Sequence, residues 1–237
     1  MRIAFRLFDV NPLHLLLCTI IIIASGSVFA YDPEEGNINA TLGPYTYRTP
    51  YNSPVPDVSS PMRGGYGLIA TGDSNSKGSV ELGMFYLDKL FLRDEGDDIL
   101  AQKVEMIHIT MGYRWWLRSW ISASLGFFSA YPLGDPKDVF KRVAPGNFLD
   151  TSAMDFCEYG FDLALQVQVF GTQKFGIVFE PRYSWNVTPK AHEAADHVGF
   201  LIGLRFMVQE KGAAKAEAQR RQHLRETDPA LNPPPKP

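Results

Sequence analysis

The feature that most constrains this chain is a period-two alternation of apolar and polar side chains that recurs along most of its length. Between Cys157 and Val169 every second residue is apolar, and the residues between them are small or polar. In the stretch from Val198 to Val208 every second residue is again apolar, although Leu201 and Met207 lie in the other phase. Because successive side chains of a β-strand point to opposite faces, each stretch is predicted to be a strand with two chemically different faces.

Five further segments of strand length alternate less cleanly: Arg63–Thr71, Ser79–Leu90, Lys103–Arg114, Trp120–Tyr131 and Phe175–Asn186. Pro181 lies within the last of these and has no N–H for a sheet ladder, so we expect a bulge or weak pairing there. Glycines recur in the polar phase: Gly65, Gly67, Gly83, Gly112, Gly126, Gly160, Gly176, Gly199 and Gly203. Glycine relieves crowding inside a narrow barrel, so this phase is predicted to face a lumen and the apolar phase to face outward.

The connections between these segments alternate between short and longer. The short ones are Gly72–Lys77, Trp116–Ser119 and Gly171–Lys174, and the longer ones are Arg93–Asp98, Pro132–Ala153 and Val187–Asp196. Barrels of bacterial outer membranes have short turns on the periplasmic side and longer loops outside. Seven strands cannot close in this way with both ends on one side, so Ile38–Thr49 is predicted to be an eighth strand.

The amino-terminal region reads as a secretory signal. An apolar run, Leu13–Ala24, follows Arg2 and Arg6, and small residues precede a cleavage position after Ala30. An uncleaved anchor helix is the alternative. The predicted organisation is a signal peptide over 1–30, an N-terminal segment over 31–37, a barrel over 38–209, and a charged, proline-rich periplasmic tail over 210–237. The tail is interpreted as solvated, with a partner-binding helix as the alternative.

Composition supports a barrel rather than other membrane or nucleic-acid-binding classes. A mean hydropathy of −0.12 excludes a bundle of membrane-spanning helices. The formal net charge of −3 provides no field that would attract nucleic acid. The fold class is therefore predicted to be all-β, a transmembrane antiparallel up-and-down barrel of eight strands with a short C-terminal tail.

The final alternating segment ends in the residues Gly203-Leu204-Arg205-Phe206-Met207-Val208. With this ending, the chain from Ile38 to Val208 resembles the small eight-stranded outer-membrane barrels of Gram-negative bacteria, of the OmpA membrane-barrel type. The resemblance implies that Gly203, Phe206 and Val208 form the signal recognised by the barrel-assembly machinery. It also implies localisation in the outer membrane, with the lipids of that membrane as partners.

The inward phase carries balanced charge: Arg63, Arg114, Arg182 and Arg205 against Glu81, Glu158, Asp162 and Glu180. Charges removed from water persist when they are paired, so these residues are interpreted as an ion-pair network that fills a closed lumen. The Gly171–Lys174 hairpin is expected to set Asp162 opposite Arg182. A narrow ion path is the alternative function for this network.

Aromatic residues with polar edges favour a membrane interface, and four are assigned to it: Trp115, Trp116, Trp120 and Trp185. A sugar-binding platform is the alternative for the tryptophan cluster. The histidines His108, His192 and His197 lack metal-ligand spacing, so we expect no metal and no cofactor. Ser152, Asp155, His192 and Asp196 could meet above the barrel as an enzyme site.

The long loop over 132–153 is the predicted recognition surface for an extracellular ligand, because binding residues concentrate on loops held by a rigid scaffold. A mobile shielding loop is the alternative. The predicted function is structural or surface-interacting, without enzyme activity. Two other functions stay open: a barrel enzyme acting on lipid A or peptides, and a soluble lipocalin-like periplasmic binder of ligands.

Overall fold

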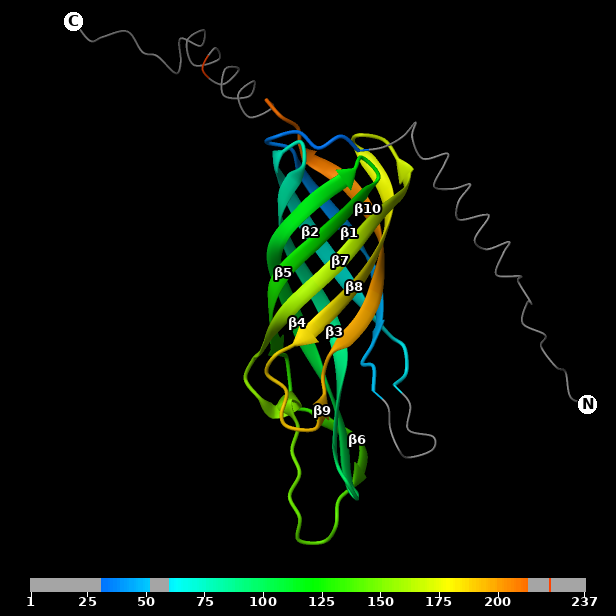
Figure 1. Ribbon diagram of the computed structural model, residues 1–237, viewed down its shortest axis with the longest axis vertical. Helices are drawn as coiled ribbons and strands as arrows, with labels where there is room; N and C mark the ends of the chain where they lie inside the picture. The colour runs from blue at the N-terminus through cyan, green and yellow to red at the C-terminus, as the bar shows by residue number, and fades with distance from the viewer. Residues whose placement is uncertain (1–30, 52–59, 213–221, 223–237) are drawn as a thin grey trace, which may run out of the picture.

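The computed structural model describes residues 31–51, 60–212 and 222. The predicted signal peptide and nearly all of the predicted tail lie outside these residues. Eight strands form the barrel: β1 (Ile38–Arg48), β2 (Arg63–Asn75), β3 (Gly78–Glu95), β4 (Asp98–Arg118), β5 (Ile121–Pro132), β7 (Glu158–Gly171), β8 (Phe175–Asn186) and β10 (His197–Gln209). Each pairs antiparallel with its neighbour along the chain, and β1 pairs with β10 to close the sheet on itself (Figure 1). The predicted all-β, up-and-down, eight-stranded fold is confirmed.

The predicted strands agree with the observed ones, including the eighth. Strand β1 covers the segment Ile38–Thr49 except its last residue, and it pairs with β2 as well as with β10. Pro181 interrupts the ladder as expected, because the pairing of β7 with β8 skips from Arg182 to Phe179. The register is the same on both sides of this gap, so the ladder weakens at Pro181 without a bulge.

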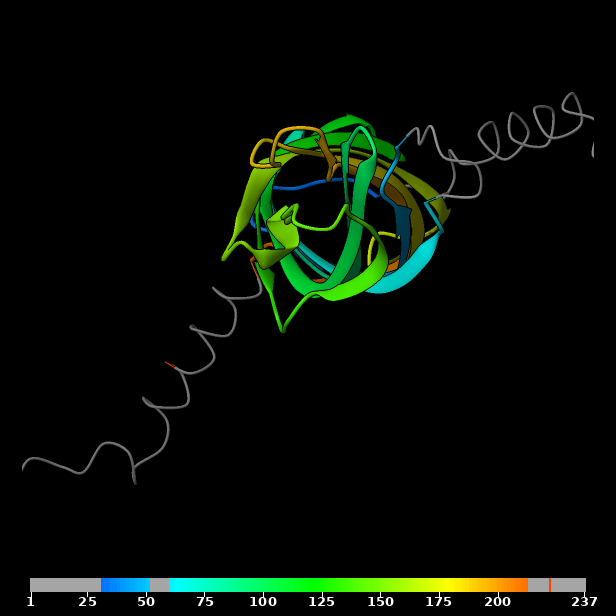
Figure 2. The ribbon, with the colours of Figure 1, turned by 90° about the horizontal axis from the view of Figure 1, so that it is seen from below.

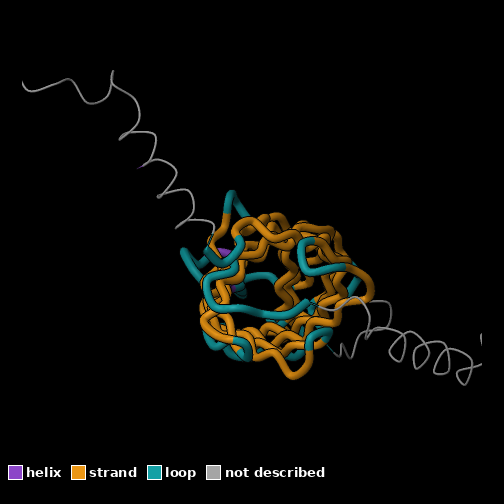
Figure 3. Tube along the Cα trace, turned by 90° about the horizontal axis from the view of Figure 1, so that it is seen from above, coloured by secondary structure: helices purple, strands orange, loops and turns teal. Residues whose placement is uncertain are grey.

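The two ends of the barrel differ. One end, here called the turn end, carries the three short connections and residues 31–37, which run across it (Figures 1 and 3). The opposite end, here called the loop end, carries the connections from β1 to β2, from β5 to β7 and from β8 to β10, together with the tip of the β3–β4 hairpin (Figure 2). This separation agrees with the alternation of short and longer connections in the sequence.

The loop end is more ordered than the sequence predicted. Strands β3 and β4 continue past the barrel as a hairpin, and two short strands join it, β6 (Lys137–Arg142) on β4 and β9 (Glu193–Ala194) on β3 (Figure 1). The expected loop Arg93–Asp98 is therefore wrong, because these residues form the end of the hairpin. The strands continue to a tight turn in which Gly96 has a φ of +72°, a conformation that favours glycine.

The alternation sorts side chains between the inside and the outside of the barrel. In β7, Glu158, Asp162 and Gln166 are buried, whereas Phe161 and Leu163 are exposed on the outer surface. Glycine in the inward phase is required where strands approach closely. A Cβ at Gly160 would lie 2.0 Å from the carbonyl oxygen of Trp185. The inside also contains an apolar cluster, Tyr45, Tyr47, Ile69, Phe85, Leu87 and Leu201, which the expectation of a polar lumen missed.

Candidate functional site

The centre of the lumen holds a cluster of two arginines and three carboxylates. Arg114 lies 2.7 Å from Glu180, and Arg182 lies 2.7 Å from the other oxygen of the same carboxylate. Glu81 bridges both guanidinium groups, with its Oε1 2.8 Å from Arg182 Nη2 and its Oε2 2.7 Å from Arg114 Nε. Asp162 lies 2.9 Å from Arg182, across the hairpin that joins β7 to β8. None of these side chains is more than about 3% exposed.

Neutral side chains complete this cluster. Gln166 donates a hydrogen bond to Glu180, and Ser122 accepts one from Arg114. The Arg182 guanidinium also lies 4.8 Å from the centre of the Phe85 ring. Charges so far from water are stable only with such close partners, since desolvation costs several kcal/mol per ion. The cluster is therefore a buried group of paired charges inside the barrel.

A second ion pair lies nearer the loop end and was missed in the sequence. Lys89 Nζ lies 2.9 Å from Glu158, and both side chains are 1% exposed. Asn186 donates a further hydrogen bond to Glu158. Lys89 belongs to the inward phase of β3, together with Glu81 and Phe85. Lys89 lies within the predicted segment Ser79–Leu90, so counting every charge of its inward phase would have identified it.

Two arginines assigned to the lumen network lie outside it. Arg63 is at the rim and pairs with Asp88, which lies on the outer face of β3, at 2.6 Å. Arg205 is buried at the turn end, where it donates a hydrogen bond to the Thr172 carbonyl and lies 4.0 Å from the centre of the Tyr31 ring. Both assignments were wrong because face alternation predicts the direction of a side chain and gives no depth along the barrel.

The two buried histidines, His108 and His197, lie between the central arginine–carboxylate cluster and the Lys89–Glu158 ion pair. His108 Nε2 is 3.0 Å from Asp162, and His197 Nε2 is 3.0 Å from Ser184. The His108 ring stacks on Phe128, and the two imidazole rings meet edge to face with their centres 5.2 Å apart. Among the residues that the structure describes, no group of three metal-binding side chains converges.

Residues 31–37 close the turn end. Tyr31 has no exposed surface, and its hydroxyl donates to Asp73 and accepts a hydrogen bond from Asn39. Asp73 also accepts hydrogen bonds from Ser79 and from the Glu34 backbone. These contacts hold the segment across the barrel end seen in Figure 3.

The four tryptophans assigned to the interface divide into two groups. Trp115 and Trp185 are about half exposed on the outer face, at opposite ends of the barrel, and Trp120 is partly buried beside the β4–β5 turn. The assignment of Trp116 to the membrane interface was wrong, because this residue belongs to the inward phase of β4. Its indole N–H donates to Ser79, and its ring lies 5.0 Å from that of Tyr31.

Residues 149–155, here called the cap, lie at the loop end and include the short 3-10 helix η2 (Ser152–Met154). Ala153 packs with Phe91, Val104 and Phe128 in one apolar cluster. Lys190 and Arg93 both contact Asp150, at 2.6 and 2.8 Å. The hydrogen bond from Lys190 lowers the pKa of the Asp150 carboxyl below its usual value, and Arg93 adds to the effect.

The residues considered as an enzyme site make separate contacts. Ser152 bonds to Glu193 and to the Lys190 backbone, while Asp196 accepts from Tyr183 and from the Asn186 backbone. No side-chain hydrogen bond or ion pair in the described chain links any two of Ser152, Asp155, His192 and Asp196. His192 is exposed, with a φ of +59°.

The closing strand places the residues of the expected assembly signal as alternation requires. Gly203 is buried and faces the lumen, whereas Phe206 and Val208 are exposed on the outer face. A Cβ at Gly203 would lie 2.5 Å from the methyl group of Thr41 on β1. Glycine therefore permits the close contact at the seam that closes the barrel.

Within residues 31–51, 60–212 and 222, no helix has both the length and the apolar character needed to cross a membrane. No protein-family model matches the sequence, and no curated protein matches it.

Solved structures of outer-membrane proteins are similar to this chain. Ail, the attachment invasion locus protein of Yersinia pestis, is 13% identical with a TM-score of 0.40, covering 73% of this chain and 99% of Ail. OprG of Pseudomonas aeruginosa is 10% identical with a TM-score of 0.46, covering 76% and 99%. AlkL in lipid bilayers is 9% identical with a TM-score of 0.35, covering 76% and 94%. The strand pairing of this chain itself establishes that its fold is a closed, eight-stranded antiparallel barrel.

Proposed function

We propose that this chain is an outer-membrane β-barrel with a closed lumen, which presents the sheet and loops at its loop end for interactions at the cell surface. The observation that carries the proposal is the inversion of polarity between the two faces. Leu163, Phe161 and Leu165 on β7 are 55%, 42% and 40% exposed on the outside, whereas the charged residues of the same strand are enclosed. Such a continuous apolar exterior is unstable in water and matches lipid.

The orientation follows from the connections. Short turns and residues 31–37 share the turn end, so this end faces the periplasm if the barrel obeys the usual asymmetry of outer-membrane barrels. The loop end then faces outward. The enclosed arginine–carboxylate cluster supports a closed lumen, because the side chains of Arg114 and Glu180, which lie inside the barrel, have no solvent-exposed surface.

A surface-interaction role is supported by the packing and strand pairing of the loop end. The β3–β4 hairpin carries its own apolar cluster of Leu90, Leu92, Ile99 and Ala101, with Phe140 of β6 packed against it. A loop that only shields the membrane needs no such core. The loop over 132–153, part of which forms β6, is therefore the proposed recognition surface, held by strands rather than left free.

Fractionation tests the location directly. We expect the protein in the detergent-extracted outer membrane, with a predicted mature amino terminus at Tyr31 on sequencing and a gel mobility that changes on heating. A freely soluble protein would overturn the proposal in favour of a lipocalin-like binder. The recognition role is tested by probing immobilised glycans and matrix proteins with the barrel in lipid nanodiscs. Binding that persists when residues 135–147 are replaced by a glycine-serine linker would contradict it.

The proposed role is non-enzymatic, supported by the separate contacts of Ser152 and Asp196. Deletion of the gene is expected to leave lipid A composition unchanged; a changed composition that an Asp196→Asn variant fails to restore would favour the enzyme instead.

We also propose that the barrel-assembly machinery recognises the closing strand. Replacing Phe206 with serine is then expected to slow insertion in cells more than the same change at Phe175, which is equally exposed.

A further inference from the structure

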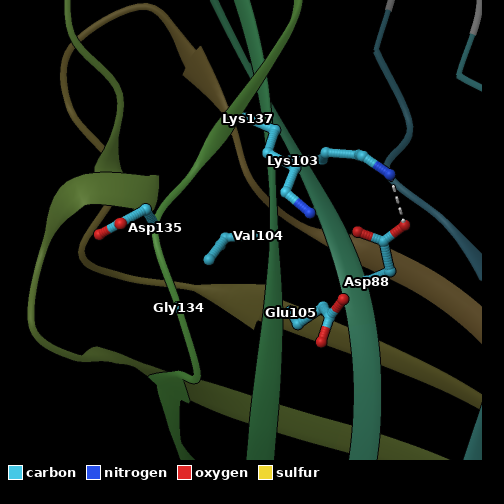
Figure 4. Close-up of a pocket in the computed structure, with 7 residues that line it drawn as sticks. All are labelled: Asp88, Lys103, Val104, Glu105, Gly134, Asp135 and Lys137. Carbon is cyan, nitrogen blue, oxygen red and sulfur yellow. Dashed lines mark hydrogen bonds and ion pairs between the residues drawn. The ribbon is translucent and has the colours of Figure 1, made fainter.

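A charged pocket lies on the outer face of the barrel where it meets the loop end. It has a volume of about 150 Å³ and is lined by residues of β3, β4, the segment before β6 and the start of β6, including Asp88, Lys103, Glu105 and Lys137 (Figure 4). Lys103 and Lys137 are direct cross-strand partners. Like charges opposite each other on neighbouring strands destabilise a sheet, so this pair favours an anion between or beside its ammonium groups.

The carboxylates of the pocket already have partners. Asp88 lies 2.6 Å from Arg63 and 3.4 Å from Lys103, and Glu105 accepts a 2.7 Å hydrogen bond from Tyr86. Lys137 makes no hydrogen bond or ion pair with any described residue, and in Figure 4 its side chain extends into the space above Glu105. The carboxylate of Asp135 points away from both lysines in the same view. Arg63, Lys103 and Lys137 thus bring three positive charges against the two carboxylates of Asp88 and Glu105, so one positive charge is left over, and Lys137 is the lysine without a carboxylate partner among the described residues.

An apolar groove of about 270 Å³ continues from this pocket toward the middle of the barrel. Leu42, Leu68, Met84 and Ile107 line it, together with Tyr86, whose hydroxyl reaches Glu105. Asp88 pairs with Glu105 and Tyr86 pairs with Ile107 in the β3–β4 ladder, so the pocket and the groove are two residues apart on the same face. This separation corresponds to about 7 Å along a strand.

We propose that this surface binds one phosphate-headed lipid, with the phosphate between Lys103 and Lys137 and an acyl chain along the groove. The inference rests on the proposed membrane location, because only a membrane-embedded barrel presents this face to lipid. Basic pockets at membrane interfaces recognise phosphate headgroups. The apolar groove distinguishes a lipid from free phosphate, which would use the lysines alone.

The test compares binding of phosphatidic acid, a diacylglycerol with the same acyl chains, and inorganic phosphate to the full chain purified in detergent, by native mass spectrometry and titration. Lys103→Gln with Lys137→Gln is expected to weaken phosphatidic acid binding about tenfold or more, since each lost charge-assisted contact has a large effect. Lys141→Gln with Lys174→Gln removes the same charge elsewhere, at exposed positions on the opposite face of β6 and at the turn end, and is expected to bind normally.

A second variant separates the two sources of phosphate. Met84→Trp fills the groove and is expected to weaken phosphatidic acid binding while leaving the lysines untouched. Unchanged phosphatidic acid binding in this variant, or inorganic phosphate binding as tight as that of the lipid, would overturn the lipid assignment. Equal binding of the lipid by the wild type and the Lys103→Gln, Lys137→Gln variant would overturn the site.

Insertion into phospholipid vesicles keeps this inference distinct from the proposed function. A barrel that inserts with normal heat-modifiable mobility but shows no preference for phosphatidic acid over diacylglycerol overturns the lipid site alone. A chain that remains in solution and does not insert overturns the proposed membrane location.

Discussion

Replacing Arg182 with methionine is expected to destabilise the barrel more than any charge removal at its surface. Arg182 contacts Asp162, Glu81 and Glu180 at 2.9, 2.8 and 2.7 Å, all within the enclosed centre. The variant leaves three buried carboxylates with Arg114 as the remaining arginine of the cluster. Removing one partner of a buried ion pair typically costs about 3–5 kcal/mol, because the remaining charge is desolvated without compensation. Arg118→Met, at an exposed position on β4, is the matched control and should change stability by less than about 0.5 kcal/mol.

A double variant tests whether the loss arises from charge imbalance. Glu180→Gln in the Arg182→Met background removes one uncompensated carboxylate, while glutamine can still accept the hydrogen bonds from Arg114 and Gln166. The double variant should therefore be more stable than the sum of the single changes predicts, by about 0.5–3 kcal/mol. Urea unfolding in lipid vesicles, followed by tryptophan fluorescence and by gel mobility, measures these differences. A loss below about 1 kcal/mol for Arg182→Met, or strict additivity, would refute the ion-cluster reasoning.

Three further predictions concern packing, pH and conductance. Gly160→Ala should destabilise the barrel by about 1–3 kcal/mol, because the added Cβ would lie 2.0 Å from the Trp185 carbonyl oxygen. In the control Gly64→Ala the added Cβ has no atom within 4 Å, so this variant should be tolerated. The temperature at which gel mobility changes on heating measures both. Because the pKa of Asp150 is lowered, its contact with Lys190 stabilises the cap fully at pH values above the usual aspartate pKa, and this stabilisation is lost as the pH falls through the lowered pKa. NMR signals of residues 150–153 should follow this titration. Lys190→Met should move the titration to higher pH. In planar bilayers the wild-type chain should give no steady conductance of porin size, and such a conductance would contradict a filled lumen.

Alternation predicted the barrel because its period is a direct consequence of strand geometry. It assigned Gly65 and Gly203 to the inside and Leu163 and Phe206 to the outside, as the structure has them. It also required an eighth strand from the parity of the connections, and β1 occupies that place.

Depth along the barrel could not be predicted in the same way, because it depends on the stagger between strands. Arg63 and Arg205 share the inward phase with Arg182 but lie at opposite ends of the molecule, beside Asp88 and Tyr31. The inward position of Lys89 could be predicted from its phase. The contact between the rings of Tyr31 and Trp116 could not, because residues 31–37 show no periodicity. The sheet at the loop end likewise depends on β6 and β9, which are too short to give a clear pattern.

Spin-label accessibility along β7 in lipid vesicles tests the central claim, that the apolar face contacts lipid and the opposite face lines a filled interior. Nitroxides attached to cysteines at Leu163 and Leu165 should be quenched by oxygen dissolved in the lipid and protected from an aqueous nickel complex. A label at Ala164, which is 7% exposed, should be reached poorly by both reagents. A label at Glu95, at the exposed end of the hairpin, should react with the nickel complex. Quenching of the Leu163 and Leu165 labels by the nickel complex, without the period-two pattern, would contradict the account.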